Sequence, residues 1–158
     1  MKKGYSLLEL IERISISNDI FYFKQDPNNI NKRNESFHSY TPLMYASRKA
    51  HANIVRFLLS KGAEIDAINT DGNTALLIAS YWGHISVIEN LINKGANLNI
   101  QNKDERARIH VAVSGGKLEV VRLLVQKGAD LSLKDEAGRT PLDIAKKKGL
   151  TAIVECLS

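Results

Sequence analysis

The side chains of this chain that could carry chemistry are four histidines, one cysteine and two pairs of adjacent acidic residues. Imidazole transfers protons or binds metals near neutral pH, and a thiolate is both a nucleophile and a metal ligand. Because there is one cysteine, Cys156, an internal disulfide framework and a multi-cysteine zinc site are excluded. We expect Cys156 to be a partly buried, small apolar residue. The histidines are His38, His51, His84 and His110.

The positions of the histidines and carboxylates indicate structural roles. His84 follows His51 by 33 residues, a spacing that many other residues of the chain share. The acidic pairs at 104–105 and 135–136 fall in expected turns, where we predict solvated carboxylates. The sequence has no glycine-rich phosphate loop, no nucleophile elbow and no cluster of cysteine and histidine. We therefore predict no catalytic residue, no metal site and no cofactor, and we interpret only His38 as a free surface histidine.

A repeat of 33 residues arranges the elements that carry these side chains. The segment Thr-Pro-Leu-Met-Tyr-Ala at 41–46 recurs as Thr-Ala-Leu-Leu-Ile-Ala at 74–79, as Ala-Arg-Ile-His-Val-Ala at 107–112 and as Thr-Pro-Leu-Asp-Ile-Ala at 140–145. Thr-Pro is typical of a helix start, with Thr as the cap. Apolar residues with i, i+3, i+4 spacing follow each segment and predict a second helix. A fixed period of this length marks an array of stacked units.

The repeated residues resemble the ankyrin repeat, whose pattern is a turn, Gly-x-Thr-Pro-Leu-His-x-Ala, a first helix, Gly-His, a second apolar helix and Gly-Ala-Asp-x-Asn. The nearest match runs from Asp-Gly-Asn-Thr at 71–74 through Gly-His at 83–84 to Gly-Ala-Asn-Leu-Asn at 95–99. In this pattern His110 occupies the position of the family's histidine. The resemblance implies an all-α solenoid of stacked helix-turn-helix units joined by β-turn or hairpin loops. It covers residues 36–158 well and the first 35 in outline.

We predict a single domain over residues 1–158. Residues 1–35 are interpreted as a degenerate amino-terminal capping repeat whose first loop has two extra residues. Full repeats are expected at 36–68, 69–101 and 102–134, and a capping repeat at 135–158. Lys146 stands where earlier units have Ser47, Ser80 and Val113, and Ser158 stands where they have an apolar residue. Polar residues at positions that would face a following unit are what an end cap requires, so we expect the array to end with the chain.

The third unit is predicted to be the weak joint of the array. Glu105 stands where Gly72 and Gly138 stand in neighbouring turns, and Ala107 replaces the capping Thr. Arg108 replaces Pro or Ala at the helix start. A residue other than glycine at positive φ and a missing cap each cost on the order of 1 kcal/mol.

The resemblance implies a partner-binding surface on the concave face, made by the turn tips and the exposed ends of the first helices. A wider set of residues carried over from the family contains ten Lys or Arg and three Asp or Glu, a net of +7 against +5 for the chain. The aromatic pair Tyr81 and Trp82 is typical of a binding hot spot, although it could instead cover the neighbouring repeat. The partner-binding residues predicted in this way are Phe37, His38, Tyr40, Arg48, Lys49, Asn73, Tyr81, Trp82, Lys103, Arg106, Ser114, Arg139 and Lys147.

The predicted function is that of a non-catalytic scaffold that binds, and could inhibit or neutralise, a partner protein with an acidic surface. The alternative is a basic repeat protein that binds nucleic acid, suggested by a pI of 9.3. Asp71, Asp104 and Glu136 interrupt any continuous phosphate track, so a nucleic-acid partner is not expected, and neither is a small-molecule substrate. The sequence leaves open whether the scaffold is an inhibitor, an immunity protein or an effector.

Composition sets the remaining expectations. With 44% hydrophobic and 25% charged residues, the chain is predicted to be an ordinary soluble protein that folds without a partner. No apolar run approaches the roughly 18 residues of a membrane span. We expect a monomer in the cytoplasm. The abundance of Asn, Ile and Lys is compatible with an AT-rich bacterial genome.

Overall fold

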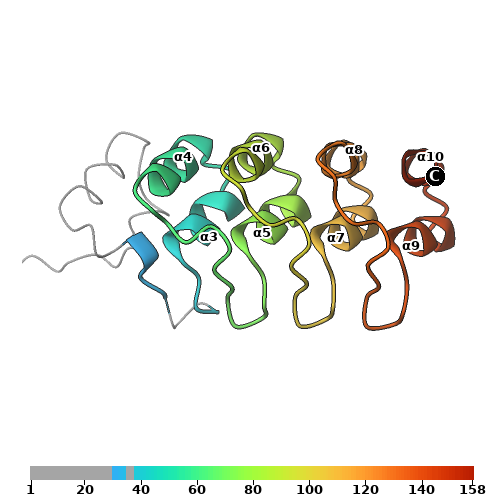
Figure 1. Cartoon of the computed structure of the whole chain (residues 1–158), viewed down its shortest axis with the longest axis horizontal. Coiled ribbons are helices and arrows are strands. Elements are labelled where there is room, and N and C mark those ends of the chain that lie inside the picture. The colour runs from blue at the N-terminus through green and yellow to red at the C-terminus, as the bar shows by residue number, and fades with distance from the viewer. Residues whose placement is uncertain (1–29, 35–37) are drawn as a thin grey trace, which may run out of the picture.

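A computed structural model describes residues 30–34 and 38–158 of the chain. The predicted capping repeat at 1–35 therefore lies almost wholly outside the described residues. Within the described part there are eight helices and no strands, as the sequence predicted (Figure 1). The helices are α3 (Pro42–Arg48), α4 (Ala52–Ser60), α5 (Ala75–Trp82), α6 (Ile85–Asn93), α7 (Arg108–Ser114), α8 (Leu118–Gln126), α9 (Pro141–Lys147) and α10 (Thr151–Leu157).

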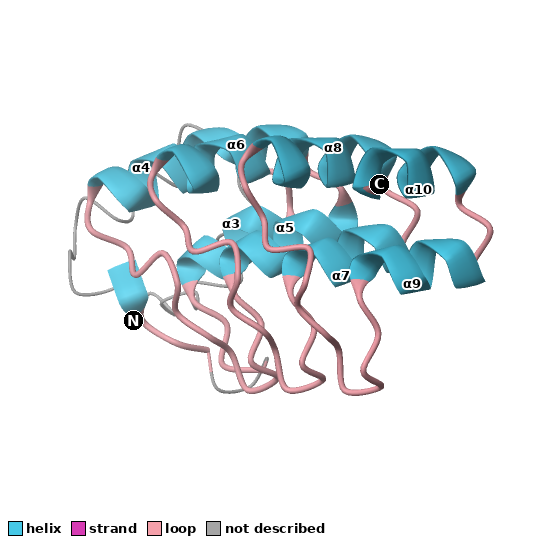
Figure 2. Cartoon of the chain, turned by 45° about the vertical axis from the view of Figure 1, so that its right-hand side comes forward, coloured by secondary structure: helices cyan, strands magenta, loops and turns pink. Residues whose placement is uncertain are grey.

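The helices form two layers, with the long loops projecting to one side (Figure 2). Helix α3 packs on α5, α5 on α7 and α7 on α9, while α4, α6, α8 and α10 form the second layer. Each helix also contacts the other helix of its own pair, for example α5 with α6. The expected all-α solenoid is thus confirmed, whereas the boundaries of its units remain a prediction.

The core explains why the helices stack so closely. The alanine at the same position of each first helix is fully buried, which lets neighbouring first helices approach one another. These alanines are Ala46, Ala79, Ala112 and Ala145. The second helices bury one apolar face each, with Leu58, Leu91 and Leu124 fully shielded from solvent.

The threonines cap the first helices as the Thr-Pro motif predicts. Thr41 Oγ1 accepts a hydrogen bond from the Met44 amide at 3.3 Å. Thr74 and Thr140 accept equivalent bonds at 3.3 and 3.2 Å. Each bond satisfies an amide that the helix itself cannot pair, so these caps fix where the first helices begin.

A row of side-chain oxygens links successive long loops and confirms the two extra residues of the first loop. Asp66 accepts from the Asn97 amide at 3.1 Å, and Asn99 accepts from the Asp130 amide at 3.1 Å, each across 31 residues. Asn31 accepts from the Glu64 amide at 2.9 Å, but across 33 residues. The connection between this first loop and the next is therefore two residues longer than the equivalent connections of the later units.

The third unit has the turn geometry that the sequence predicts. Glu105 has a φ of 54°, and the equivalent Gly72 and Gly138 have φ of 76° and 74°. Ser39 occupies the same position in the first turn with a φ of 53°. Since only glycine adopts this region without a steric penalty, Glu105 stores strain in its turn.

We expect Glu105→Gly combined with Ala107→Thr to raise the free energy of unfolding by about 1–2 kcal/mol. The glycine relieves the strain at positive φ, and the new threonine supplies a helix cap. Denaturant midpoints of the variant and the natural protein measure the gain. Glu136→Gly is the matched control because Glu136 lies in the next turn without a positive φ, so this variant should lose stability. Equal effects of the two glycines would contradict the strain at Glu105.

His110 restores part of the cap that Ala107 lacks. Its Nδ1 accepts a hydrogen bond from the Ala107 amide at 3.2 Å, so Nε2 carries the ring proton. Nε2 donates to the carbonyls of Leu133 and Arg139 at 3.0 and 3.2 Å. The ring is fully buried, and burial lowers its pKa from the ordinary 6.5, while the carbonyl bonds and nearby Asp135 act in the opposite direction. His84 also has a structural role, since its Nε2 lies 3.0 Å from the Arg48 carbonyl oxygen.

The lowered pKa of His110 predicts a loss of stability in mild acid. Below pH 6.5 the His110 ring becomes protonated in the unfolded chain but stays neutral in the folded chain until a lower pH. Unfolding is therefore increasingly favoured as the pH falls. The loss is at most about 1.4 kcal/mol for each pH unit. His110→Gln keeps an acceptor for the Ala107 amide and cannot titrate, so it should flatten this part of the stability profile. Denaturant midpoints between pH 7.5 and 5 test this, and identical profiles would contradict it.

Arg108 is not the simple defect that its position suggested. It is the largest fully buried side chain of the described residues. Its Nη2 donates to Thr74 Oγ1 at 2.9 Å and its Nη1 to the Ile100 carbonyl at 3.2 Å, so it joins the third unit to the second. Nε finds no hydrogen-bond partner. Burial lowers the pKa of Arg108 to about 10, with the charge of Asp66 opposing this.

Candidate functional site

The turn tips are built around one Asn or Asp side chain each. Asn69 Oδ1 accepts from the amides of Asp71 and Asn73 at 3.0 and 2.8 Å. Asn102 and Asp135 accept equivalent pairs of bonds from the amides two and four residues later. A side chain that bonds its own turn in this way fixes the turn's shape. We had not predicted this role, although the 33-residue spacing of these three residues was the signal for it.

Neighbouring turn tips are joined by backbone hydrogen bonds. The Thr70 amide donates to the His38 carbonyl at 3.1 Å, and the Lys103 amide donates to the Asp71 carbonyl at 3.2 Å. The Glu136 amide donates to the Asp104 carbonyl at 3.3 Å. Gly72 lies against this contact, and a Cβ on it would come within 3.0 Å of the Lys103 nitrogen. The tips therefore form a continuous row that places their side chains along one face.

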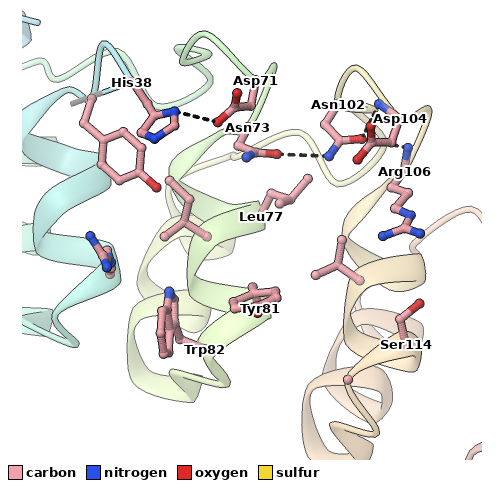
Figure 3. Close-up of a pocket in the computed structure, with 15 residues that line it drawn as sticks. His38, Asp71, Asn73, Leu77, Tyr81, Trp82, Asn102, Asp104, Arg106 and Ser114 are labelled. Carbon is pink, nitrogen blue, oxygen red and sulfur yellow. Dashed lines mark hydrogen bonds and ion pairs between the residues drawn. The ribbon is translucent and has the colours of Figure 1, made fainter. Parts of the chain in front are cut away.

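Between this row and helices α3, α5 and α7 lies a hollow of about 610 Å³, which we call the groove (Figure 3). Its volume lies within the range of ligand-binding clefts. It brings together turn tips, the faces of α5 and α7, and the carboxyl ends of α3, α5 and α7. Its lining residues are His38, Tyr40, Arg48, Asp71, Asn73, Leu77, Ile78, Tyr81, Trp82, Asn102, Asp104, Arg106, Val111, Ser114 and Gly115.

The groove has an apolar floor and an aromatic wall. Leu77, Ile78 and Val111 form the floor and are each less than one-tenth exposed. Tyr81 is 61% exposed and Trp82 47%, and their rings meet edge to face with centroids 5.4 Å apart. Large apolar side chains that are this exposed contribute little to the core of the array. Their exposure therefore favours the interpretation of Tyr81 and Trp82 as a binding surface over the alternative that they cover the neighbouring repeat.

Trp82 also borders a second hollow of about 360 Å³. That hollow lies beside the start of α6 and the amino-terminal half of α8, with Ile85 and Leu118 among its lining. On the groove side, the Arg48 guanidinium carbon lies 5.8 Å from the Trp82 ring centroid, within the range of a cation–π contact. Trp82 thus stands between two depressions, where an occupant of either would contact its ring.

The polar rim of the groove is formed by the turn tips. His38 Nδ1 lies 3.2 Å from Asp71 Oδ2, and both side chains are more than half exposed. The interpretation of His38 as a free surface residue was therefore wrong: it is on the surface, but it pairs with the next turn. Asn102 Nδ2 donates to Asn73 Oδ1 at 3.1 Å, which orients the Asn73 amide.

The charge of the groove differs from the sequence-based tally. The lining residues include two arginines, Arg48 and Arg106, and two aspartates, Asp71 and Asp104. The lysines that raised the tally to +7 lie elsewhere. Lys61, Lys94 and Lys127 cap the carboxyl ends of α4, α6 and α8 and do not line the groove. The groove itself therefore has no excess of positive charge, while the concentration of charge on the wider concave face stays a prediction.

Some predicted binding residues do not line the groove. Lys49, Lys103 and Lys147 are exposed outside it, and Phe37 lies outside the described residues. Arg139 is held by Asp135, since its Nη2 and the Asp135 Oδ2 are 2.7 Å apart.

This ion pair also corrects the interpretation of the acidic pairs in the turns. Asp135 is only 3% exposed, so it is not a solvated carboxylate. Its hydrogen bonds with Arg139 lower the pKa of Asp135 to about 2, against the opposing effect of burial.

The described residues show no arrangement for metal chemistry or membrane insertion. In residues 30–34 and 38–158 no three His, Cys, Asp or Glu side chains gather where they could hold a metal ion. Over the same ranges, no helix combines the length and apolar composition needed to cross a bilayer. Cys156, in the last helix, is partly buried as expected.

The layered helix pairs and the row of turns define a helical repeat protein, and comparison with known proteins identifies its family. A family model described as ankyrin repeats (3 copies) matches residues 5–102 and residues 89–158. A search of the curated proteins found no match. The chain therefore belongs to the ankyrin-repeat family, whose members generally mediate protein–protein interactions and are typically non-catalytic.

Proposed function

We propose that this chain is a non-catalytic scaffold that binds a partner protein in the groove. The observation that carries the proposal is the exposure of Tyr81 and Trp82 beside the apolar floor of the groove. Aromatic side chains of this kind contribute most of the binding energy at many interfaces, because they offer a large rigid surface at a small entropic cost. The binding would inhibit or neutralise the partner if the contacted surface were its working surface.

The partner is proposed to present an acidic surface. The support is the net charge of +5 of the chain, since the two arginines of the groove are matched in number by its two aspartates. At long range a positive chain attracts a negative partner and accelerates association. Asp71 and Asp104 in the lining would repel the regularly spaced phosphates of a nucleic acid, so a protein is favoured over that alternative. We also propose that the scaffold acts as a monomer in the cytoplasm, where a lone thiol stays reduced.

A paired capture experiment tests the proposal. The chain and its Tyr81→Ala/Trp82→Ala variant are immobilised in equal amounts and exposed to the same native lysate. We expect at least one protein to be retained by the natural chain and lost from the variant. Each bait is first shown to be folded by circular dichroism. Retention of the same proteins by both baits would place binding outside the groove.

A further inference from the structure

Three features of the groove, considered together, indicate which part of a partner it accepts. The first is the floor of Leu77, Ile78 and Val111, which is apolar and adjoins the exposed Tyr81 ring. Burying an aliphatic side chain there removes apolar surface of both molecules from water, which is favourable. A small polar ligand would leave this floor unused, so the floor requires an apolar anchor.

The second feature is the Asn73 side chain. Because its Oδ1 accepts from Asn102 Nδ2, the orientation of the amide is fixed. The Asn73 Nδ2 group donates to no other described residue and belongs to the groove lining (Figure 3). A fixed side-chain amide that keeps two free donors can bind a backbone carbonyl. An extended peptide presents such a carbonyl, whereas the carbonyls inside a helix are already bonded.

The third feature is Arg106, whose backbone is fixed while its guanidinium is available. The Arg106 amide donates to Asn102 Oδ1 at 3.0 Å, and its carbonyl accepts from the Asn102 amide at 3.1 Å. Among the described residues no hydrogen bond or ion pair reaches its guanidinium, which extends along the α7 side of the groove in Figure 3. A planar guanidinium binds a carboxylate through two parallel hydrogen bonds, a geometry that Lys does not offer.

We infer that the groove binds an extended peptide segment in which an aliphatic residue has an acidic residue beside it. The aliphatic side chain lies on the floor beside Tyr81, a backbone carbonyl accepts from Asn73, and a carboxylate pairs with Arg106. This inference rests on the proposed function and adds the chemistry of the bound segment. Asp104 on the same turn tip disfavours a second carboxylate there, so the acidic residue must lie on the Arg106 side of the anchor.

Short peptides test this inference without knowledge of the partner. The probes are capped octapeptides with a central Leu flanked by Glu, by Gln or by Lys, together with a Glu-flanked peptide whose Leu is replaced by Ser. Trp82 is the only tryptophan of the chain, so its emission reports occupation of the groove, and calorimetry gives the affinity. We expect the Glu peptide with Leu to bind at least about tenfold more tightly than the Gln, Lys or Ser peptide.

Two arginine variants with the same change of net charge locate the carboxylate contact. Arg106→Gln should reduce the preference for the Glu over the Gln peptide to about twofold or less. Arg122→Gln should leave the preference unchanged, because Arg122 lies on α8, pairs with Glu119 and does not line the groove. Equal effects of both variants, or tighter binding of the Lys peptide, would overturn the inference.

The same experiment separates this inference from the proposed function. If the Lys peptide binds best and Tyr81→Ala abolishes its binding, the groove is a peptide site with a different preference, and only the acidic chemistry is wrong. If no peptide binds at about 1 mM but binding of a captured protein still requires Tyr81, the inference of an extended peptide is wrong, whereas the proposed protein-binding function stands. If neither peptides nor proteins depend on Tyr81, both proposals are wrong.

Discussion

Replacing Trp82 or Tyr81 by alanine is expected to weaken binding of the partner protein by about 2 kcal/mol, or roughly thirtyfold. Both side chains are about half exposed in the free chain, so their burial in a complex would contribute directly to affinity. Removing such an anchor chiefly accelerates dissociation, because it does not change the long-range approach of the two proteins. Surface plasmon resonance with the captured partner separates the two rates.

Ile68→Ala is the matched control for these variants. Ile68 is an exposed apolar residue, 49% accessible, that does not line the groove. We expect this variant to bind like the natural chain. Normal affinity of Tyr81→Ala and Trp82→Ala, with both variants folded, would show that the aromatic wall is not part of the interface.

Arg108→Ala is expected to lower the free energy of unfolding by about 2–5 kcal/mol. The variant loses the packing of the largest fully buried side chain and its hydrogen bonds to Thr74 and Ile100. The variant also no longer buries a charged group. For a pKa lowered to about 10, this burial costs the natural chain about 3 kcal/mol. Lost packing and two charged hydrogen bonds together amount to about 5–8 kcal/mol, so the loss outweighs the relief.

Arg108→Met distinguishes the two contributions. Methionine keeps most of the length of the side chain but has no charge, so the cavity and the desolvation cost both disappear. We expect its stability to lie within about 1.5 kcal/mol of the natural chain and above that of Arg108→Ala. Urea denaturation of the three proteins measures this order. A gain in stability from Arg108→Ala, which restores the alanine that α5 has as Ala75, would mean that the desolvation cost dominates.

The fold was predictable because the repeat specifies local and packing interactions together. Thr at the helix start, alanine on the face of the first helix and leucine on the second helix recur at one spacing, and each has the structural role that its type predicts. Even the positive φ of Glu105 follows from its alignment with Gly72 and Gly138. Local propensity and pattern agree at these positions, which makes a sequence easy to interpret.

The third unit was harder to predict because substitutions there act together. From sequence, Arg108 replaced a small residue and Ala107 had lost a cap. In the structure Arg108 reaches Thr74 of the preceding unit, and His110 accepts the Ala107 amide. Alignment of the repeats compares each residue only with the residues at the same position of the other units. The contacts of Arg108 and His110 join residues at different positions of the repeat, so the alignment could not reveal them.

The groove was predicted in part. Alignment with the family located the tips and the aromatic pair, and many of the predicted residues indeed line one hollow. The tally of charges does not describe the groove, because it included lysines at the carboxyl ends of the outer helices, such as Lys94. A lysine at the carboxyl end of a helix interacts favourably with the helix dipole whatever the chain binds. The number of these lysines is therefore no evidence about the charge of a partner.

The most direct test of the proposed groove is the indole resonance of Trp82 in a complex. In a uniformly ¹⁵N-labelled chain the only tryptophan gives one indole N–H signal, and an unlabelled partner protein contributes none. We predict that this signal shifts or broadens on addition of the captured partner and saturates with the same affinity as the complex. An unchanged indole signal at saturation, with backbone amides shifting elsewhere in the chain, would contradict binding in the groove.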